Sequence, residues 1–431
     1  MVGIRNILIK SLCNVQALKY HSRQRIFKVR YAYNSTLAYV WGAGDGGQLA
    51  RSTSPVNTSP LKYTCKEEVS HIGCGFGFTV ISQQHSSELW IFGVNSSLQF
   101  DRSSKDDFSK PHSVALPVES LDTRVKQISC GRSHILVLTD KEGAFAIGGN
   151  SQGQCGIGDG STKLLKSFQK LHMPEGENII KVVCGLDHSI FLTESGKVFS
   201  CGWGADGQTG LGHFKDETSI KQVKGSIEDV FIRDVASSVD CCIAVSDKGE
   251  VYTWGNSEYD QLGVETEEKQ ISIATKASLL SHLGKVEHVS AAGSFSVLTT
   301  EDGALYTWGY GVLGHGPNVT SSKSPKKIKN ADEIGEEISQ LHTGLDHTAV
   351  VTASGKLFVW GRGSFGRLGL GQETDQWTPK QVILPGVVLE VSCGVDHMGV
   401  IVQYTDGPTN LELLPQYKAQ PTIIDVSNIV D

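Results

Sequence analysis

A residue pair that ends in glycine, most often tryptophan–glycine, recurs along this chain and limits its fold more than any other feature. Its seven glycines lie 51, 55, 54, 53, 54 and 52 residues apart, at Gly42, Gly93, Gly148, Gly202, Gly255, Gly309 and Gly361. A second mark, usually cysteine–glycine, recurs at Gly75, Gly131, Gly185, Gly293, Gly344 and Gly394, with Ser238 in the remaining repeat. A fixed period of this length is typical of repeat folds, whose units pack on their neighbours to form a core. Glycine suits such turns because they need positive φ or close backbone approach.

The interval from each second mark to the next first mark predicts a β-hairpin. In residues 179–202 (IIKVVCGLDHSIFLTESGKVFSCG), residues 180–183, 188–193 and 197–201 each have strand character. Gly196 supplies the positive φ of the turn between the last two strands, and the same turn recurs at Gly143, Gly249, Gly303 and Gly355. The remaining 33 to 38 residues of a repeat have room for one more strand. Four strands per repeat indicate one blade of a β-propeller.

The order of the marks predicts how the propeller closes. The chain opens with a tryptophan–glycine strand (residues 40–42) that lacks a preceding hairpin partner, and it ends with a cysteine–glycine strand pair (389–401) that lacks a following one. Together these segments complete one blade, which removes the open edge of an unclosed ring. We therefore predict an all-β fold over residues 36–402, a seven-bladed β-propeller closed by a composite blade from both chain ends. WD40 and kelch repeats, at about 40–45 and about 50 residues, fit the spacing less well.

Charge separates the first 35 residues from the rest. They carry seven basic residues and no acidic one, so their charge is +7, whereas the remaining 32 basic and 46 acidic residues sum to −14. The segment is also amphipathic, because one arc of a helical wheel contains Ile4, Ile7, Leu8, Leu12, Val15 and Leu18. This pattern predicts a mitochondrial transit peptide at residues 1–35, with a disordered basic arm as the alternative. No apolar run is long enough for a transmembrane span.

Several motifs that often hold cofactors match this sequence only through its repeat. Three GxGxxG stretches begin at Gly42, Gly202 and Gly361, all at one repeat phase, and each is followed by turn-like sequence instead of a helix. The GxSxG at residues 149–153 is likewise a blade turn, because a nucleophile elbow needs a helix after it. No P-loop is present, and the ten cysteines include no CxxC pair. We expect no cofactor, no metal and no covalent chemistry.

The turns resemble those of the regulator of chromosome condensation family of seven-bladed propellers. The shared sequence motifs are Cys-Gly-x-x-His and Trp-Gly-x-x-x-x-Gly-Gln-Leu-Gly, and the resemblance covers nearly all of residues 38–402. The blocks CGWGADGQTGLGH (201–213), WGNSEY (254–259), WGYGVLGHGPN (308–318) and CGVDHM (393–398) look closer still to the mitochondrial, exchange-factor-like branch of the family. The amino-terminal segment agrees with that resemblance independently.

The resemblance implies a function and a set of partners. It implies a mitochondrial guanine nucleotide exchange factor-like propeller, in the matrix or associated peripherally with the inner membrane. Its implied partner is the dynamin-like GTPase of mitochondrial fusion. It also implies a role in mitochondrial ribosome biogenesis, through rRNA-processing and ribosome-assembly proteins that contact the large-subunit rRNA. The alternative is a non-enzymatic scaffold of that assembly module without exchange activity.

Aspartates and histidines after the cysteine–glycine mark form the candidate site. The residues are Asp187, His188, Asp240, Asp346, His347, Asp396 and His397. Because each mark lies at the tip of a hairpin, these residues should ring one face of the propeller. Two interpretations stay open: the aspartates bond backbone amides of their own turns and the histidines pack within the blades, or the acidic face docks a basic partner surface. In the resembled family, an acid and a histidine in such loops help to loosen bound nucleotide. Residues 403–431 carry no repeat mark and are predicted to be a C-terminal tail.

Overall fold

The structure of the protein is a computed structural model that describes residues 35–50, 54–63, 65, 67–95, 110–120, 122–329 and 334–404. The described residues belong to one compact unit, which begins at Asn34. The predicted transit peptide and C-terminal tail lie almost wholly outside the described residues. In the described part of the chain, no helix is long and apolar enough to cross a membrane.

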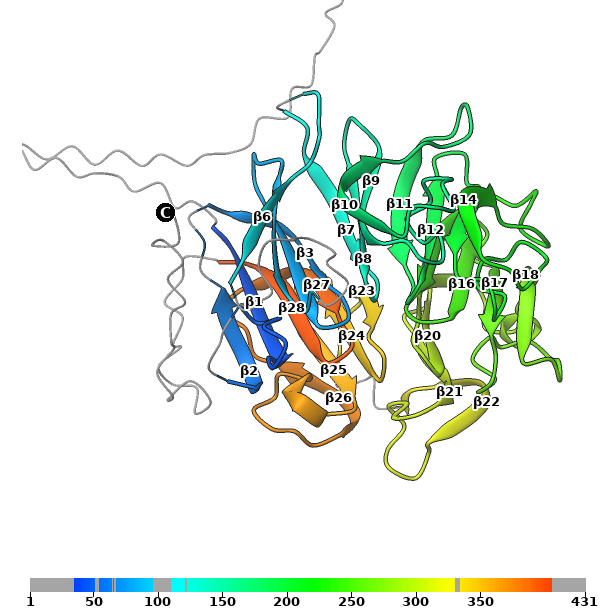
Figure 1. Ribbon diagram of the computed structural model, residues 1–431. Helices are drawn as coiled ribbons and strands as arrows, with labels where there is room; N and C mark the ends of the chain where they lie inside the picture. Colours follow the sequence, from blue (N-terminus) through cyan, green and yellow to red (C-terminus); the bar gives the residue numbers. More distant parts are fainter. Residues whose placement is uncertain are drawn as a thin grey trace, which may run out of the picture. The chain divides into compact units, whose positions relative to one another are not determined.

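Seven four-stranded antiparallel sheets make up the described unit, which confirms the predicted all-β, seven-bladed propeller (Figure 1). Blade 1 consists of β3 (Val69–Cys74), β4 (Phe78–Gln83), β5 (Glu88–Gly93) and β6 (His112–Ala115). Blade 2 consists of β7 (Val125–Cys130), β8 (His134–Thr139), β9 (Ala144–Gly149) and β10 (Leu164–Lys170). Blade 3 consists of β11 (Ile179–Cys184), β12 (His188–Thr193), β13 (Val198–Gly202) and β14 (Glu217–Gln222). Blade 4 consists of β15 (Ile232–Ser237), β16 (Cys241–Ser246), β17 (Val251–Asn256) and β18 (Gln270–Lys276).

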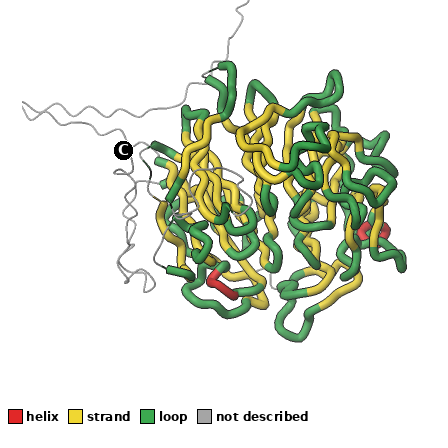
Figure 2. Tube along the Cα trace, viewed as in Figure 1, coloured by secondary structure: helices red, strands yellow, loops and turns green. Residues whose placement is uncertain are grey.

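The remaining blades follow the same order. Blade 5 consists of β19 (Val286–Ala291), β20 (Phe295–Thr300), β21 (Leu305–Tyr310) and β22 (Ser321–Lys327). Blade 6 consists of β23 (Ile338–Thr343), β24 (His347–Thr352), β25 (Leu357–Gly361) and β26 (Gln376–Val382). Blade 7 combines β1 (Thr36–Ala43) and β2 (Val56–Tyr63) with β27 (Val387–Cys393) and β28 (His397–Gln403). Short 3-10 turns at Ser278–Leu280 and Ser364–Gly366 interrupt this strand-and-loop pattern (Figure 2).

Blade 7 is built from both ends of the described chain. Its strand order is β2-β1-β28-β27, and β1 pairs with β28 in antiparallel register from Thr36 opposite Gln403 to Gly42 opposite His397. The innermost strands contact one another in the cyclic order β3, β7, β11, β15, β19, β23, β27 and back to β3. The ring of sheets is therefore continuous, with β1 and β28 joining its two ends as the order of the marks predicts.

The core lies between neighbouring blades. The second strand of blades 2, 3, 4, 5 and 6 is buried along its whole length, because both of its faces pack against adjacent sheets. Each hydrophobic cluster spans two blades, as in the cluster that joins Leu136 and Leu138 of blade 2 to Val182 and Phe191 of blade 3. The indole rings of the marks, Trp41, Trp254, Trp308 and Trp360, are fully buried in these interfaces.

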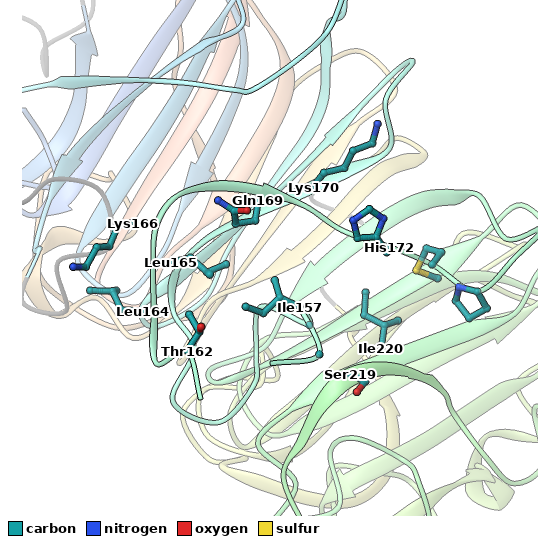
Figure 3. Close-up of a pocket in the computed structure, with 14 residues that line it drawn as sticks. Ile157, Thr162, Leu164, Leu165, Lys166, Gln169, Lys170, His172, Ser219 and Ile220 are labelled. Carbon is teal, nitrogen blue, oxygen red and sulfur yellow. The ribbon is translucent and has the colours of Figure 1, made fainter. Parts of the chain in front are cut away.

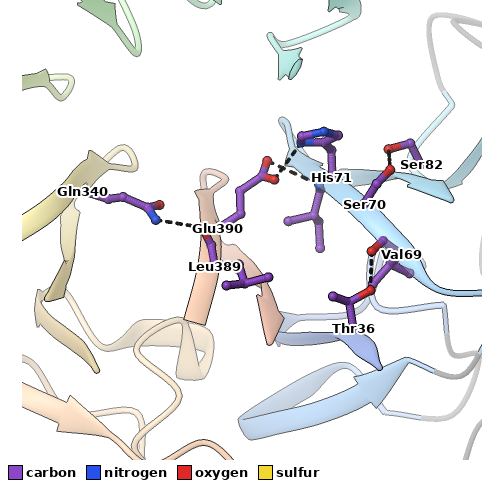
Figure 4. Close-up of polar contacts among 9 residues, drawn as sticks. Thr36, Val69, Ser70, His71, Ser82, Gln340, Leu389 and Glu390 are labelled. Atoms are coloured by element: carbon purple, nitrogen blue, oxygen red, sulfur yellow. Dashed lines mark hydrogen bonds and ion pairs between the residues drawn. The ribbon is translucent and has the colours of Figure 1, made fainter. Parts of the chain in front are cut away.

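Polar side chains link the innermost strands, which lie too far apart to share a ladder (Figure 4). On β27, the Glu390 carboxylate (Oε2) pairs with Nδ1 of His71 on β3 at 2.9 Å. On β23, the side-chain amide of Gln340 donates to the carbonyl oxygen of Leu389 at 2.8 Å. These contacts supply hydrogen bonds between blades along the central axis.

The two glycine marks are explained by different physical requirements. All seven first-mark glycines have positive φ, for example 107° at Gly202, where a Cβ would also lie 2.6 Å from the Asp187 carbonyl oxygen. Five of the six second-mark glycines make room for a ring instead: a Cβ on Gly185, for example, would lie 2.0 Å from Cε1 of His188. In blade 5 the second mark is offset by one residue: Ala292, not Gly293, donates its N–H to the carbonyl three residues ahead.

Candidate partner-binding face

The two kinds of marked loop emerge at the same end of the propeller. Backbone bonds join them: Trp203 donates its N–H to the carbonyl oxygen of Asp187 at 2.9 Å, and Asn256 donates to that of Asp240 at 2.8 Å. Equivalent bonds link Arg362 to Asp346 and Ala43 to Asp396. The fold thus places Asp187, Asp240, Asp346 and Asp396 at one end of blades 3, 4, 6 and 7, which we call the aspartate face.

Asp187 is held in an ion pair between two blades. Its side chain is only 10% exposed, and its carboxylate accepts from Nε of Arg132 in blade 2 at 3.2 Å and from the Nη2 atom of the same guanidinium. The side-chain amide of Gln154, also in blade 2, lies 3.5 Å from Oδ1. Burial raises the pKa of Asp187, and the Arg132 charge opposes that rise. This carboxylate therefore serves the blade interface.

Asp240 is a partly buried carboxylate without an ion pair among the described residues. The amide of Gln208 in blade 3 donates to its Oδ1 at 3.1 Å. Burial, and next the charge of Asp206, raise the pKa of Asp240 to about 6. The carboxylate is mostly ionised at neutral pH and keeps hydrogen-bonding capacity for a partner.

Asp396 and Asp346 differ as Asp187 and Asp240 do: the first of each pair forms an ion pair with an arginine, and the second forms none with a described residue. Nη2 of Arg367 donates to Oδ1 of Asp396 at 2.6 Å, and the same guanidinium donates to the carbonyl oxygens of Ser364 and Val395. Asp346 is partly exposed and makes no ion pair within the described ranges. Asp240 and Asp346 are thus the two predicted carboxylates best placed to meet a partner.

The predicted histidines do not reach the surface. His188, His347 and His397 are fully buried, as is His134 in blade 2. Nε2 of His188 lies 3.1 Å from the Ser237 hydroxyl, and burial lowers the pKa of His188 to about 3 and that of His397 to about 4. Neutral, buried rings of this kind join blades, so the exposed part of the predicted site consists of its aspartates.

A cavity and several aromatic side chains accompany the carboxylates. The cavity has a volume of about 700 Å³ and is lined by Asp45, Asp187, Asp396 and Arg132 between the exposed rings of Phe76 and Phe365. On blades 4 and 5, Tyr259 and Tyr310 stack with their centroids 5.5 Å apart and are about half exposed. No group of three or more His, Cys, Asp and Glu side chains in the described part is arranged to hold a metal ion.

Sequence reasoning missed the residues that hold the aspartates in place. They lie at the second position of the Gly-Gln-Leu-Gly-like turns, as Gln154, Gln208 and Arg367, and each reaches the aspartate of the next blade. The backbone carbonyl of the same residue accepts from the next blade as well: Trp254 donates to Gln208 and Trp41 donates to Arg367, both at 2.9 Å. Glutamine recurs at this position of the turns although the turn conformation alone does not require it, and that recurrence could have indicated these residues from the sequence.

Comparison with known proteins places this architecture in a family. The family model described as the RCC1-like domain matches residues 37–400. The chain belongs to the RCC1-like domain family. The human RCC1-like G exchanging factor-like protein is 38% identical to it over 398 residues, which cover 87% of this chain and 86% of that protein.

Other relatives have different names, and the family alone does not fix a function. The ultraviolet-B receptor UVR8 of Arabidopsis thaliana is 32% identical over 346 residues, with 79% of this chain and 76% of the receptor covered. Among solved structures, human WBSCR16 superposes with a TM-score of 0.80 at 36% identity, over 85% of this chain and 100% of that chain. Prp20p of Saccharomyces cerevisiae superposes with a TM-score of 0.73 at 20% identity, over 87% and 94% of the two chains, and shares the fold.

Proposed function

We propose that this propeller is a guanine nucleotide exchange factor-like protein that acts through the aspartate face on the dynamin-like GTPase of mitochondrial fusion. The observation that carries the proposal is that two carboxylates with no ion pair to a described residue, those of Asp240 and Asp346, lie at the same end of the ring as exposed aromatic side chains. The names of the human and mouse relatives, both RCC1-like G exchanging factor-like proteins at 38% identity, support it.

The proposed activity needs no covalent chemistry from the propeller. An exchange factor accelerates nucleotide release when it binds the nucleotide-free state of the GTPase more tightly than the loaded state. Carboxylates on the aspartate face would attract basic loops that otherwise hold phosphate, while Tyr259 and Tyr310 would supply apolar contact area. The −14 charge of residues 36–431 would speed the approach of a basic surface.

Release of labelled GDP from the purified fusion GTPase tests this proposal. The wild-type propeller should accelerate release, and Asp240→Asn with Asp346→Asn should reduce the acceleration about tenfold, equivalent to about 1.4 kcal/mol of lost partner binding. Asp302→Asn is the matched control, because Asp302 lies at a hairpin turn on the opposite end of blade 5. An acceleration that is absent in the wild type, or equal in both variants, refutes the exchange mechanism.

The mitochondrial location and the role in ribosome biogenesis belong to the same proposal. The charge of residues 1–35 supports import, and a chain that lacks these residues should stay in the cytosol. Depletion of the protein should lower the level of mature large-subunit rRNA in mitochondria. If depletion leaves that level unchanged, the ribosomal role is refuted, and an import-competent truncated chain would refute the targeting function of residues 1–35.

The scaffold alternative is favoured by one observation. Asp187 and Asp396 are engaged by Arg132 and Arg367, so half of the predicted acidic ring holds the propeller together. A scaffold should recover ribosome-assembly proteins in a pull-down from mitochondria and leave GDP release unchanged. The same negative charge disfavours direct binding to RNA phosphates, so RNA should be recovered only through those proteins.

A further inference from the structure

A groove of about 650 Å³ lies on the rim between blades 2 and 3 and shares Leu164 with the cavity at the aspartate face (Figure 3). Strand β10 of blade 2 lines one side and contributes Leu165 to the floor, together with Ile157 from the preceding loop. Residues Ser219 and Ile220 of β14 line the other side. The floor is apolar, and the edge of β10 that faces away from β9 is not paired with any strand in the described part of the chain.

The next blade interface shows what occupies this position. After β14 the chain turns across the rim, and Gly225 forms a parallel bridge with Ala274 on β18 of blade 4. The N–H of Ala274 donates to the Lys224 carbonyl oxygen at 2.9 Å, and the N–H of Ser226 donates to the Ala274 carbonyl oxygen at 2.8 Å. A segment of the chain itself therefore fills the groove between blades 3 and 4.

The corresponding residues between blades 2 and 3 follow from the repeat register. The N–H of Leu171 donates to the carbonyl oxygen of Ala144 in blade 2, and the N–H of Val223 donates to that of Val198 in blade 3, so Leu171 and Val223 are equivalent. Three residues further along the chain, Pro174 is therefore equivalent to Ser226. The isolated bridges from Ile157 to Ser219 and from Leu211 to Ile273 show that Ile220 takes the place of Ala274.

Proline explains why this groove stays open. Pro174 has no N–H, so it cannot donate to the Ile220 carbonyl oxygen as Ser226 donates to that of Ala274. No backbone hydrogen bond joins residues 172–174 to Ile220 in the described structure. Ile220 therefore differs from Ala274, whose amide and carbonyl both bond to the segment that crosses the rim, although Met173 packs against the cluster that contains Ile220.

The charge around the groove selects the chemistry of that segment. Lys166 and Lys170 of β10 both line the groove, and His172 lies beside Lys170 (Figure 3). Neither lysine forms an ion pair with a carboxylate among the described residues, although backbone hydrogen bonds and, to a smaller extent, the Lys170 charge lower the pKa of Glu142 and the propeller as a whole is acidic. The lysines are four positions apart on β10, at most about 13 Å at 3.3 Å per residue, because the register of β10 with β9 shifts between Leu165 and Gln169.

We propose that the groove between blades 2 and 3 binds an extended peptide of a partner protein that carries aliphatic residues between two acidic residues about four positions apart. The peptide backbone pairs with Ile220 as residues 224–226 pair with Ala274. Its aliphatic side chains contact Ile157 and Leu165, and its carboxylates meet Lys166 and Lys170. This is strand addition to a sheet edge, in which the backbone supplies affinity and the side chains supply specificity.

Fluorescence polarisation of a labelled synthetic peptide, GSEVLVESG, against the full-length chain tests the proposal. The wild type should bind it and should bind the charge-reversed peptide GSKVLVKSG at least tenfold more weakly. Lys166→Glu with Lys170→Glu should weaken binding of the acidic peptide at least tenfold. Lys326→Glu with Lys327→Glu, which makes the same charge change on exposed β22 of blade 5, should leave it unchanged.

A second pair of variants tests the groove geometry. Met173→Gly with Pro174→Ser copies Gly225–Ser226 of blade 3, so the chain should close its own groove and the peptide should lose binding while the protein stays folded. Met173→Gly alone keeps the proline and should still bind the peptide.

Four outcomes would overturn the proposal. The first is that the wild type does not bind the peptide, and the second is that both lysine double variants bind it equally well. The third is that the protein forms a dimer that Lys166→Glu with Lys170→Glu dissociates, because the groove would then bind a second copy of the chain. The fourth is binding that appears only when Asp425→Asn and Asp431→Asn are introduced, which would assign the groove to the protein's own C-terminal residues.

Discussion

Replacement of His347 by phenylalanine should stabilise this protein, and the reason lies in the neighbouring blade. His134, His188 and His397 each place Nε2 within 3.1 Å of a hydroxyl on the following blade. For His347, Met398 stands where Ser189 and Thr79 supply the hydroxyls for His134 and His397, and both ring nitrogens are buried without a hydrogen-bond partner among the described residues. Blades 1 and 5 already carry phenylalanine at the histidine position, so the ring fits.

The size of the effect can be estimated from two contributions. Removal of an unsatisfied buried polar group should recover about 1–3 kcal/mol. Burial also lowers the pKa of His347 to about 3, so the folded protein keeps the ring neutral while the unfolded chain takes up a proton below pH 6.5. The wild type therefore loses stability as the pH falls, and at pH 5 the phenylalanine variant should gain a further ~2 kcal/mol.

Urea unfolding followed by tryptophan fluorescence at pH 7.5 and pH 5 measures this effect, with His188→Phe as the matched control. Both variants lose one buried histidine titration, so both should gain from the pH change alike. At pH 7.5 only His188→Phe breaks a hydrogen bond, so it should lower the urea midpoint while His347→Phe raises it. If His347→Phe is as destabilising as His188→Phe, a bound water satisfies the His347 ring and the reasoning is wrong.

Three further variants test the aspartate face and the glycine marks. Asp240→Asn should stabilise the protein by about 1–3 kcal/mol at pH 8 and not at pH 3.5, because a folded pKa of about 6 makes ionisation costly as the pH rises through it; thermal unfolding at both values checks this. Arg367→Met should lower the free energy of unfolding by about 1–3 kcal/mol, since it removes the hydrogen bonds of a buried guanidinium to Asp396 and to two carbonyl oxygens; an effect below about 1 kcal/mol in urea unfolding would show that the pair is screened. Gly185→Ala should lower the free energy of unfolding by about 3 kcal/mol or more, because its methyl group would overlap the His188 ring. Thermal unfolding followed by circular dichroism measures this, and an unchanged midpoint would show that the loop relaxes to admit the methyl group.

The number of blades, the hairpin turns and the composite sheet follow from the sequence because glycine leaves a strong local signature. A position with φ near 107°, as at Gly202, tolerates little else, so the repeat can be counted from glycines alone. The hairpin turns at Gly143 and Gly196 also have positive φ, as predicted.

The use of each side chain could not be predicted in the same way, because it depends on the neighbouring blade. Asp187 and Asp240 occupy the same repeat position, yet only Asp187 meets an arginine, which comes from a loop 55 residues earlier. The depth of the histidines also depends on the next blade, which covers them. In blade 5, Ala292 makes the backbone bond that the second-mark glycine makes in other blades. The Phe295 ring therefore packs in that blade without a glycine at this position.

The junction in blade 7 has a mechanical consequence. Thr36 and Gln403 face each other at one end of the β1–β28 ladder, and both flanking segments leave from that end. A pulling force applied between the two chain ends would load one hydrogen-bonded pair at a time, so the ladder would unzip instead of shearing. The propeller should therefore resist force between its ends more weakly than it would if the same ladder were loaded along its strands.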